Sequence, residues 1–292
     1  MKKYIILTSV LILSVVLITS CDKEGMYKPG QKISKIYYQY SAEGETSGKM
    51  IDQIWTWEGG KLVKINYIQE GESAVMEYDG NQLIGVIGEY YYMSFVYKTS
   101  LLGGKKELEK MEYYDGGELA FTANFTYDGN KITKISIVAE YDEYDYDYAS
   151  EKTIKNSNSF ARIMRLFLSE PIVKRITENI QKSKAVIQTY DLTYDGNNII
   201  SIIYNTGESF YNLSYTYDDK KNPFYDALFV SGDNPVLALS ENNIQSEAVS
   251  SSGYSSIQNY TYVYEGNWPT QQTYIYEDEY YTYTITTFYE YE

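Results

Sequence analysis

The chain has 292 residues, a formal net charge of −15, and 36 Tyr, 9 Phe and 3 Trp. It contains 0 His, which excludes a Ser-His triad and imidazole metal ligands. Its net negative charge disfavours nucleic-acid binding, because such binding depends on Lys and Arg side chains at the phosphates. We therefore expect no enzyme activity, no cofactor, no metal site and no nucleic-acid partner; a carboxylate-dependent hydrolase stays an alternative for which no residue pair can be nominated.

Residues 1–21 are predicted to be a lipoprotein signal peptide. Lys2 and Lys3 precede an apolar run over 5–17, which is shorter than the ~20 residues of a membrane-spanning helix. The run ends in "LITSC", which resembles the lipobox of bacterial lipoproteins, and Cys21 is the only cysteine. Lipidation of Cys21 would make the membrane a partner; an ordinary secretory signal is the alternative.

Residues 22–32 are predicted to be a polar tether. Asp22 and Glu24 resemble the acidic export signals that follow the lipidated cysteine in surface lipoproteins of some Gram-negative anaerobes. We expect an outer-membrane lipoprotein that is exposed at the cell surface, with the periplasmic face as the alternative.

Residues 33–292 carry a recurrent turn signature, in which an aromatic residue is followed by an acidic residue and usually by Gly and Asn. Asp-Gly and Gly-Asn are strong hairpin signals because both tolerate positive φ. Either pair could form the corner, so the register stays open; with Gly129 and Asn130 at the corner, Asp128 would lie opposite Lys131. The signatures are "TWEGGKLVKI" (56–65), "EYDGNQLIGV" (77–86), "TYDGNKITKI" (126–135), "TYDGNNIISI" (193–202), "TYDDKKNPFY" (216–225) and "VYEGNWPTQQ" (263–272).

Between the turns, apolar and polar residues alternate with a period of two, as in "KITKISIVAEY" and "YYTYTITTFYEYE". Such alternation indicates antiparallel strands with one drier face. Because a long meander must protect its edges, we predict one all-β domain over 33–292: an antiparallel up-and-down meander that closes into a β-barrel or forms a large curved sheet.

Two segments depart from this pattern. The spacing of apolar residues in 157–184 predicts a short helical insertion, and 152–184 carries eight Lys or Arg and two Glu, a net +6. Its basic face either complements acidic neighbours or contacts anionic lipid or a charged partner. The tract "YDEYDYDYAS" (141–150) is predicted to be a solvated strand or loop, and Ca²⁺ coordination is the alternative.

The Tyr-Asp-Gly-Asn signature resembles the YD-type hairpin repeats of bacterial surface proteins. More specifically, "YDDKKNPFY", followed by "ALSENNI" and "YTYVYEGNWPTQ", is similar to a family of Gram-negative lipoproteins known only as a domain of unknown function with a porin-like fold. The resemblance covers most of 33–292, with 220–224 as its most specific part. It implies a β-barrel and a surface location, and it implies no reaction.

These observations favour a membrane-anchored surface lipoprotein that acts as a binding or accessory protein, for a glycan or for another surface protein. An integral porin-like barrel is the first alternative, although residues such as Lys64 would be costly against lipid. Tyrosine-rich faces can stack on sugars, but the same residues serve cross-strand packing, and both interpretations stay open. The candidate ligand platforms are Tyr90, Tyr91, Tyr92, Trp55, Trp57, Tyr274 and Tyr276.

Overall fold

The computed structural model describes residues 27, 29–42, 44–99, 106–139, 187–205, 210–227, 238–252, 254–277 and 282–292. These residues form seventeen β-strands. The strands are β1 (Ile33–Ala42), β2 (Glu45–Thr46), β3 (Met50–Glu58), β4 (Lys61–Tyr67), β5 (Glu72–Asp79), β6 (Gln82–Ile87), β7 (Tyr91–Thr99), β8 (Lys106–Asp115), β9 (Glu118–Asp128), β10 (Lys131–Ala139), β11 (Ile187–Asp195), β12 (Asn198–Asn205), β13 (Phe210–Lys221), β14 (Asn242–Ser251), β15 (Tyr254–Glu265), β16 (Trp268–Glu277) and β17 (Thr282–Tyr291).

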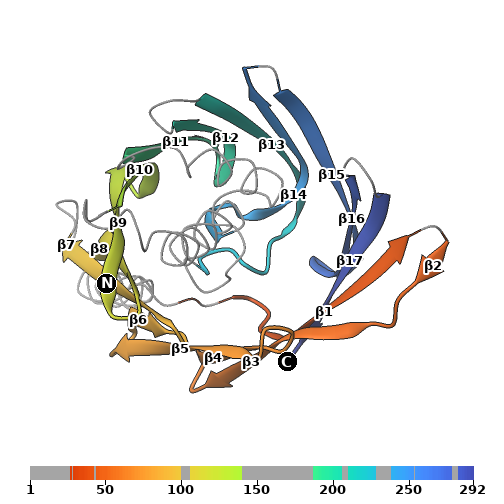
Figure 1. Ribbon diagram of the computed structural model, residues 1–292, viewed down its shortest axis with the longest axis horizontal. Coiled ribbons are helices and arrows are strands. Elements are labelled where there is room, and N and C mark those ends of the chain that lie inside the picture. The colour runs from red at the N-terminus through yellow and green to blue at the C-terminus, as the bar shows by residue number, and fades with distance from the viewer. Residues whose placement is uncertain are drawn as a thin grey trace, which may run out of the picture.

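Sixteen of these strands close into an antiparallel barrel (Figure 1). Strands from β3 to β17 each pair with the next strand in sequence, and β1 completes the ring by pairing with β17 on one side and with β3 on the other. The short β2 pairs only with β1 at its far end. Closure satisfies the backbone groups that an open sheet would leave at its edges. The predicted all-β meander and barrel are confirmed.

The alternation of side chains gives the barrel an apolar inner wall and a more polar outer wall. On β9, Phe121, Ala123 and Phe125 are buried in the core, whereas Thr122 and Asn124 lie on the other face. Along the circumference, the buried apolar side chains of neighbouring strands are paired in register, as in Phe125 with Ile135 and Ile135 with Tyr190. This period-two pattern is the one that the sequence indicated.

Hairpin turns with the Tyr-Asp-Gly-Asn signature all lie at one end of the barrel, which we call the turn end. Because neighbouring strands are antiparallel, every odd-numbered strand from β3 to β15 ends at this end of the barrel, and the following even-numbered strand begins there. Asp128 pairs with Lys131, so Gly129 and Asn130 form the corner. Gly129 has a φ of 62°, as the first corner residue of a type II′ turn requires. The structure thus decides between the two registers that the sequence allowed.

The uneven spacing of the signatures follows from this arrangement. The 49 residues between the second and third signatures span two hairpins, because β7 ends and β8 begins at the turn end and the intervening sequence 100–105 lacks the signature. The other long intervals contain the connections after β10 (140–186) and after β13 (222–241). One hairpin is therefore the repeating unit, and the barrel contains eight of them, counting β17 with β1.

Each hairpin pairs an aromatic residue with an aliphatic residue or proline beside a β-bulge, at the first inward position from the turn end. The bulge shifts the register by one residue in every case. Pro269 is tolerated at its bulge because no ladder hydrogen bond is required from its backbone nitrogen. The eight pairs are Trp57–Leu62, Tyr78–Leu83, Tyr97–Leu108, Tyr127–Ile132, Tyr194–Ile199, Tyr217–Ile244, Tyr264–Pro269 and Tyr291–Ile33.

Hydrogen bonds link most of these pairs to the neighbouring hairpin, and we call the ring of eight pairs the aromatic belt. The aromatic residue of one hairpin donates to the backbone carbonyl at the bulge of the preceding hairpin, as Tyr78 does to Leu62 at 2.8 Å. The equivalent bonds are Trp57 Nε1 to Ile33 O (2.7 Å), Tyr97 to Leu83 O (2.8 Å), Tyr194 to Ile132 O (2.9 Å), Tyr217 to Ile199 O and Tyr291 to Pro269 O (2.6 Å). Tyr127 occupies the corresponding position; burial raises its pKa, and a hydrogen bond with the backbone of Leu108 partly offsets this rise. The aromatic residue of the signature recurs because a bulge leaves a backbone carbonyl that needs a donor.

Several sequence-based predictions lie outside the described residues: the signal peptide with Cys21, the acidic tract 141–150 and the helical insertion 157–184. Within the described part of the chain, no helix has the length and apolar character needed to cross a membrane.

Candidate functional site

The aromatic belt is broken at one position, between β13 and β15. By analogy with the other hairpins, Tyr264 would donate to the carbonyl of Ile244, but its hydroxyl is hydrogen-bonded to the carboxylate of Asp218 instead. Tyr262, one inward position further along β15, donates to Ile244 O at 2.8 Å. Departures from a repeated pattern tend to mark sites with a separate role.

Asp218 accepts four further hydrogen bonds from three donor groups, one on its own strand and two on Asn243 of β14. The backbone N–H groups of Lys220 and Asn243 donate to Oδ1 at 2.9 and 3.2 Å, and Asn243 Nδ2 lies 3.4 and 3.3 Å from the two carboxylate oxygens. Burial, followed by the hydrogen bond and the charge of Asp218, raises the pKa of the Tyr264 hydroxyl, so it stays a donor at neutral pH. The carboxylate thus joins β13, β14 and β15.

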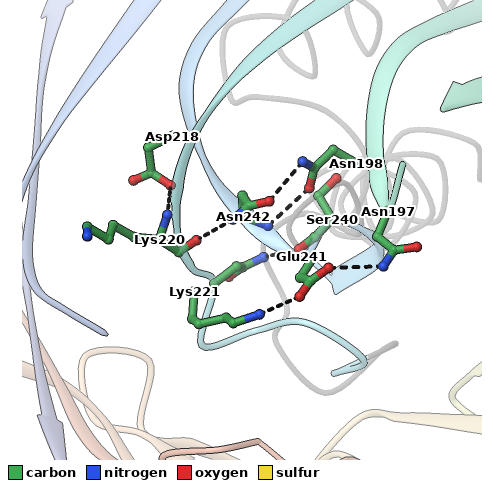
Figure 2. A network of polar contacts seen from close by, with 9 residues as sticks. Asn197, Asn198, Asp218, Lys220, Lys221, Ser240, Glu241 and Asn242 are labelled. Atoms are coloured by element: carbon green, nitrogen blue, oxygen red, sulfur yellow. Dashed lines mark hydrogen bonds and ion pairs between the residues drawn. The ribbon is translucent and has the colours of Figure 1, made fainter. Parts of the chain in front are cut away.

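A polar network extends from Asp218 to the turn between β11 and β12 (Figure 2). Asn198 and Asn242 exchange two hydrogen bonds of 3.0 Å, and Asn242 Nδ2 donates to Lys220 O at 2.8 Å. Glu241 accepts from Asn197 at 2.9 Å and forms an ion pair with Lys221. The network fastens both ends of the β13–β14 connection to the neighbouring hairpin.

The same network brings together the three sequence elements that carry the family resemblance. Lys220 and Lys221 belong to "YDDKKNPFY", Glu241 and Asn242 belong to "ALSENNI", and Lys221 N donates to the carbonyl of Asn267 in "YEGNWPTQ" at 3.0 Å. Because these side chains are hydrogen-bonded mainly to one another, we interpret the network as a structural link between the three elements.

Trp55 and Trp57 lie in an aromatic cluster inside the turn end, which we call the anchor cluster (Tyr27, Trp55, Trp57 and Phe224). The ring centroid of Tyr27 lies 6.3 Å from that of Trp55 and 5.6 Å from that of Trp57. The centroids of Trp55 and Phe224 are 6.2 Å apart. The Tyr27 hydroxyl donates to the carbonyl of Pro223. Trp55 is 3% exposed and donates to Gln53 Oε1 at 2.9 Å, so it packs in the core and presents no open ring face.

Tyr90, Tyr91 and Tyr92 do not share one surface, because successive residues of a strand point to opposite faces. Tyr91 stacks on Tyr113 of the inner wall, with centroids 5.7 Å apart, whereas Tyr92 lies against Tyr114 on the outer wall at 6.0 Å. Tyr90 precedes β7 and is 63% exposed.

Tyr274 and Tyr276, by contrast, share the inner wall of β16 and continue into tyrosines of neighbouring strands. Tyr276 stacks on Tyr283 with a centroid distance of 4.9 Å, and Tyr283 meets Tyr40 edge-on at 6.4 Å. We call these three residues the rim stack, because they lie near the end of the barrel opposite the turn end. Tyr40 is 39% exposed, and Tyr276 and Tyr283 are half-buried.

Two other tyrosine-rich stacks lie at the same end, and both are more deeply buried. Tyr190, Tyr204 and Tyr211 stack across β11, β12 and β13 with centroid distances of 4.5 and 5.9 Å, and the first two are 1% and 0% exposed. Tyr113 and Phe121 stack at 5.0 Å and are also buried. Among the three stacks, the rim stack offers the most accessible ring surface.

Polar side chains of the inner wall concentrate next to the rim stack, on β14 to β17. Tyr274 lies 5.6 Å from the ring of Tyr260, whose hydroxyl reaches Oε2 of Glu247 at 3.4 Å. Glu247 is 2% exposed and also accepts from Tyr215 at 3.4 Å. Burial, followed by the charge of Glu247, raises the pKa of the Tyr215 and Tyr260 hydroxyls.

Gln272 lies deeper on the same wall. Its amide Nε2 donates to the Tyr262 hydroxyl at 2.9 Å, and its Oε1 accepts from Tyr289 at 3.2 Å. Sequence reasoning missed Glu247 and Gln272, because their inward position becomes visible only once the register of β14 and β16 is known. The alternation of β16 around Tyr274 is the one signal that could have found Gln272.

Chemically, this wall combines ring faces with hydroxyl, amide and carboxylate groups, which suits hydrogen bonding and stacking more than bond-breaking chemistry. Within the described ranges, no cluster of three or more His, Cys, Asp or Glu could hold a metal ion. The rim stack and the residues below it form the candidate binding surface.

Comparison with known proteins supports the fold. No family model and no curated protein matches the chain. Among solved structures, a porin-like protein from Bacteroides uniformis is similar with a TM-score of 0.52 and 12% identity, covering 92% of this chain and 100% of the other. A porin-like protein from Bacteroides vulgatus has a TM-score of 0.47 and 13% identity over 90% and 99% of the two chains. At these identities, the first match shows a shared barrel fold and nothing further.

Proposed function

We propose that the protein is a lipoprotein of the outer cell envelope whose barrel stands in water and binds a ligand, and that it is not an integral porin and not an enzyme. The observation that carries this proposal is the polarity of the outer wall. A barrel embedded in lipid needs an apolar outer band with its polar side chains inside, and this barrel has the opposite distribution.

Charged groups on the outer wall illustrate the point. Lys134 lies within β10, flanked by Thr126 and Asp191, and its Nζ is 3.6 Å from Asp191 Oδ1. On β8, hydrogen bonding from Lys110 lowers the pKa of Glu112, which keeps this carboxylate ionised. A lysine facing lipid at the bilayer midplane costs about 2–4 kcal/mol, so several such positions disfavour an embedded barrel.

Uncharged positions of the outer wall are also largely polar. Thr261, Thr273 and Thr286 form one outward row across β15, β16 and β17. Apolar side chains do occur, as in the neighbouring pair Val75 and Ile87 at 40% and 41% exposure, but exposed apolar residues of this kind are ordinary on water-soluble surfaces.

Fractionation of a version that starts at residue 22 tests the proposal. We expect it to remain in the supernatant after ultracentrifugation without detergent, at a size that matches a folded monomer or defined oligomer. The full-length chain should sediment with the outer membrane and carry an acyl mass on the mature N-terminus, and Cys21→Ser should abolish both. A detergent requirement for the unanchored barrel would favour the integral alternative.

For the ligand, we propose a glycan that stacks on the rim stack. Tyrosine rings present apolar faces with polar tips, and Glu247 and Gln258 lie on the same wall, paired in register with one another. The grouping of Tyr274 and Tyr276 with Tyr283 and Tyr40 supports this surface over the other predicted platforms. The negative charge of −15 favours neutral over anionic glycans.

A glycan array followed by titration calorimetry tests this assignment, with neutral plant and host oligosaccharides set against heparin and polygalacturonate. We expect binding to a neutral oligosaccharide, and we expect Tyr276→Leu and Tyr283→Leu to weaken it at least tenfold while circular dichroism stays unchanged. Tyr92→Leu, on the outer wall, is the matched control and should bind as the parent does. Loss of binding only in the Tyr92 variant would move the site to the outer wall.

A further inference from the structure

We infer that the turn end of the barrel faces the lipid bilayer and that the rim stack opens away from it. This inference rests on the proposed lipid anchor at Cys21. It goes further because it fixes the orientation of the barrel and the side from which a ligand approaches.

Tyr27 ties the N-terminal segment to the inside of the turn end. Its side chain is 3% exposed, its ring lies against Trp57 of the aromatic belt, and its hydroxyl donates to Pro223 in the β13–β14 connection. Burial raises the pKa of this hydroxyl far above its ordinary value, so it remains a neutral donor at physiological pH. Although Tyr27 lies within the predicted tether, it is held by the barrel.

The chain length between Tyr27 and Cys21 then limits the distance to the membrane. Five residues separate the two positions, and six Cα–Cα steps span at most about 20 Å. The barrel wall is longer than this reach: a strand of 11 residues such as β9 extends about 27 Å along the axis at ~3.3 Å per residue and a tilt of ~40°. An acyl chain on Cys21 can therefore bring the turn end to the headgroups, while the opposite end stays in solution.

Charges at the turn end indicate that the lipid anchor, and not a basic patch, holds this face to the membrane. Glu58, Asp79 and Asp128 flank the turns, and the Nζ atoms of Lys61 and Lys131 are hydrogen-bonded to the carbonyls of Gly80 and Gly196. Because mixed surface charges give no net attraction to anionic lipid, membrane association should change little with salt.

The rim stack lies at the other end of the same walls. Strand β16 runs from Trp268 at the turn end to Glu277, and Tyr276 is its penultimate residue. Tyr283 lies directly opposite Tyr276 at the start of β17. A ligand of the rim stack thus approaches from the solvent side, where the bilayer does not block it.

Single-cysteine labelling can measure this orientation, because Cys21 is the only native cysteine and its thiol is consumed by the proposed acylation. Asn130→Cys places a donor dye at a turn-end corner, and Glu118→Cys places it at an exposed position at the opposite end. The acylated protein is reconstituted into vesicles of phosphatidylethanolamine and phosphatidylglycerol with an acceptor dye on the headgroups. We expect at least twofold higher energy transfer from residue 130 than from residue 118, at 50 and 500 mM salt alike.

Two further variants make the result decisive. Tyr27→Ala releases the segment from the anchor cluster, and a 20-residue Gly-Ser insertion after Glu24 lengthens the tether; both should reduce the difference between the two positions. Equal transfer from both positions in the parent, or higher transfer from residue 118, overturns the orientation. Mass spectrometry of the same sample separates this outcome from failure of the proposed anchor, since a protein without an acyl mass would show that Cys21 is not lipidated.

Discussion

The hydroxyl of Tyr194 donates a hydrogen bond of 2.9 Å to the backbone carbonyl of Ile132 on the preceding hairpin. The two residues are 62 positions apart in the chain, and the same relationship recurs around the aromatic belt. The acceptor carbonyl is available because the adjacent bulge interrupts the ladder. The belt thus couples each hairpin to its neighbour at the turn end, where the loops alone would leave the ends of the strands free to separate.

Removing one belt hydroxyl should therefore destabilise the barrel. We expect Tyr194→Phe to lower the free energy of unfolding by about 1–2 kcal/mol, because a buried carbonyl loses its partner. Urea denaturation followed by far-ultraviolet circular dichroism measures the change. Tyr90→Phe, at a side chain that is 63% exposed, is the matched control and should be neutral; equal midpoints for both variants would show that the belt contributes nothing.

The contact between Asp218 and Tyr264 should show energetic coupling. A charge-assisted hydrogen bond in a half-buried setting is stronger than a neutral one, so the double-mutant cycle of Asp218→Asn and Tyr264→Phe should give a coupling energy of about 1–2 kcal/mol. Thermal and urea unfolding of the parent, the two single variants and the double variant provide the four values. Additive effects would mean that Tyr264 merely packs beside Asp218.

Gln188 offers the opposite case, a buried amide whose replacement should stabilise the protein. Its side chain is 1% exposed, and among the residues that the structure describes neither Nε2 nor Oε1 has a hydrogen-bond partner. An unsatisfied buried amide costs about 1–3 kcal/mol, so Gln188→Leu should raise the unfolding free energy by a comparable amount. Gln53→Leu is the matched control: Gln53 is 4% exposed and accepts from Trp55, and its replacement should be destabilising. A loss of stability in the Gln188 variant would instead indicate an ordered water at the amide.

Alkaline pH should unfold the barrel in a defined window. Burial raises the pKa of Tyr78 from 10.0 to about 12, and it raises that of Tyr97 and Tyr194 further. Because the folded state holds these protons more tightly than the unfolded chain does, their stabilising contribution is complete below pH 10 and falls as the pH rises toward and beyond 12. Urea midpoints should be constant from pH 7 to about 9.5 and decline above it.

Absorbance of tyrosinate at 295 nm provides the control for this window. We expect the belt tyrosines, whose pKa burial raises, to ionise together with the loss of the circular dichroism signal. Full ionisation of all tyrosines in a folded barrel would contradict the burial of the belt.

The position of β1 predicts tolerance to circular permutation. The ends of the barrel sequence are adjacent, since Glu292 N donates to Lys32 O at 2.9 Å and their side chains form an ion pair at 3.6 Å. We expect a chain that joins residue 292 to residue 29 through a short Gly-Ser linker, and begins at Asn81 in the β5–β6 corner, to fold with an unchanged circular dichroism spectrum. A permutant opened inside β12, between Ile202 and Ile203, breaks the ladder and should not fold.

Much of the architecture could be predicted from local patterns. The alternation in "KITKISIVAEY" indicated strands, and the Gly-Asn corners indicated hairpins, because both signals depend on residues that are close in sequence. The recurrence of the signature also indicated a repeated unit. The 47 residues between the last two signatures comprise one hairpin repeat plus the 222–241 connection. Periodicity cannot distinguish an additional hairpin from a long loop of similar length.

The candidate site was only partly accessible from sequence. Tyr274 and Tyr276 were both proposed as ligand contacts, and they share the inner wall because two residues of one strand that are two positions apart lie on the same face. Tyr90, Tyr91 and Tyr92 were grouped by adjacency alone, and the strand places the last two on opposite walls. Glu247 could not be chosen among 40 acidic residues, because its burial depends on β13 and β15, which flank it on either side.

By itself, the amino-acid sequence determined the strand-built character of the domain and the hairpin as its repeating unit, since turn chemistry and alternation act over a few residues. Only the tertiary structure decided that β1 closes the ring against β17, that a tyrosine hydroxyl meets the bulge of another hairpin, and that the apolar side chains face inward. These relationships join residues as far apart in the chain as Ile33 and Tyr291, and the pairing of such residues is set by closure of the whole barrel, which no local segment encodes.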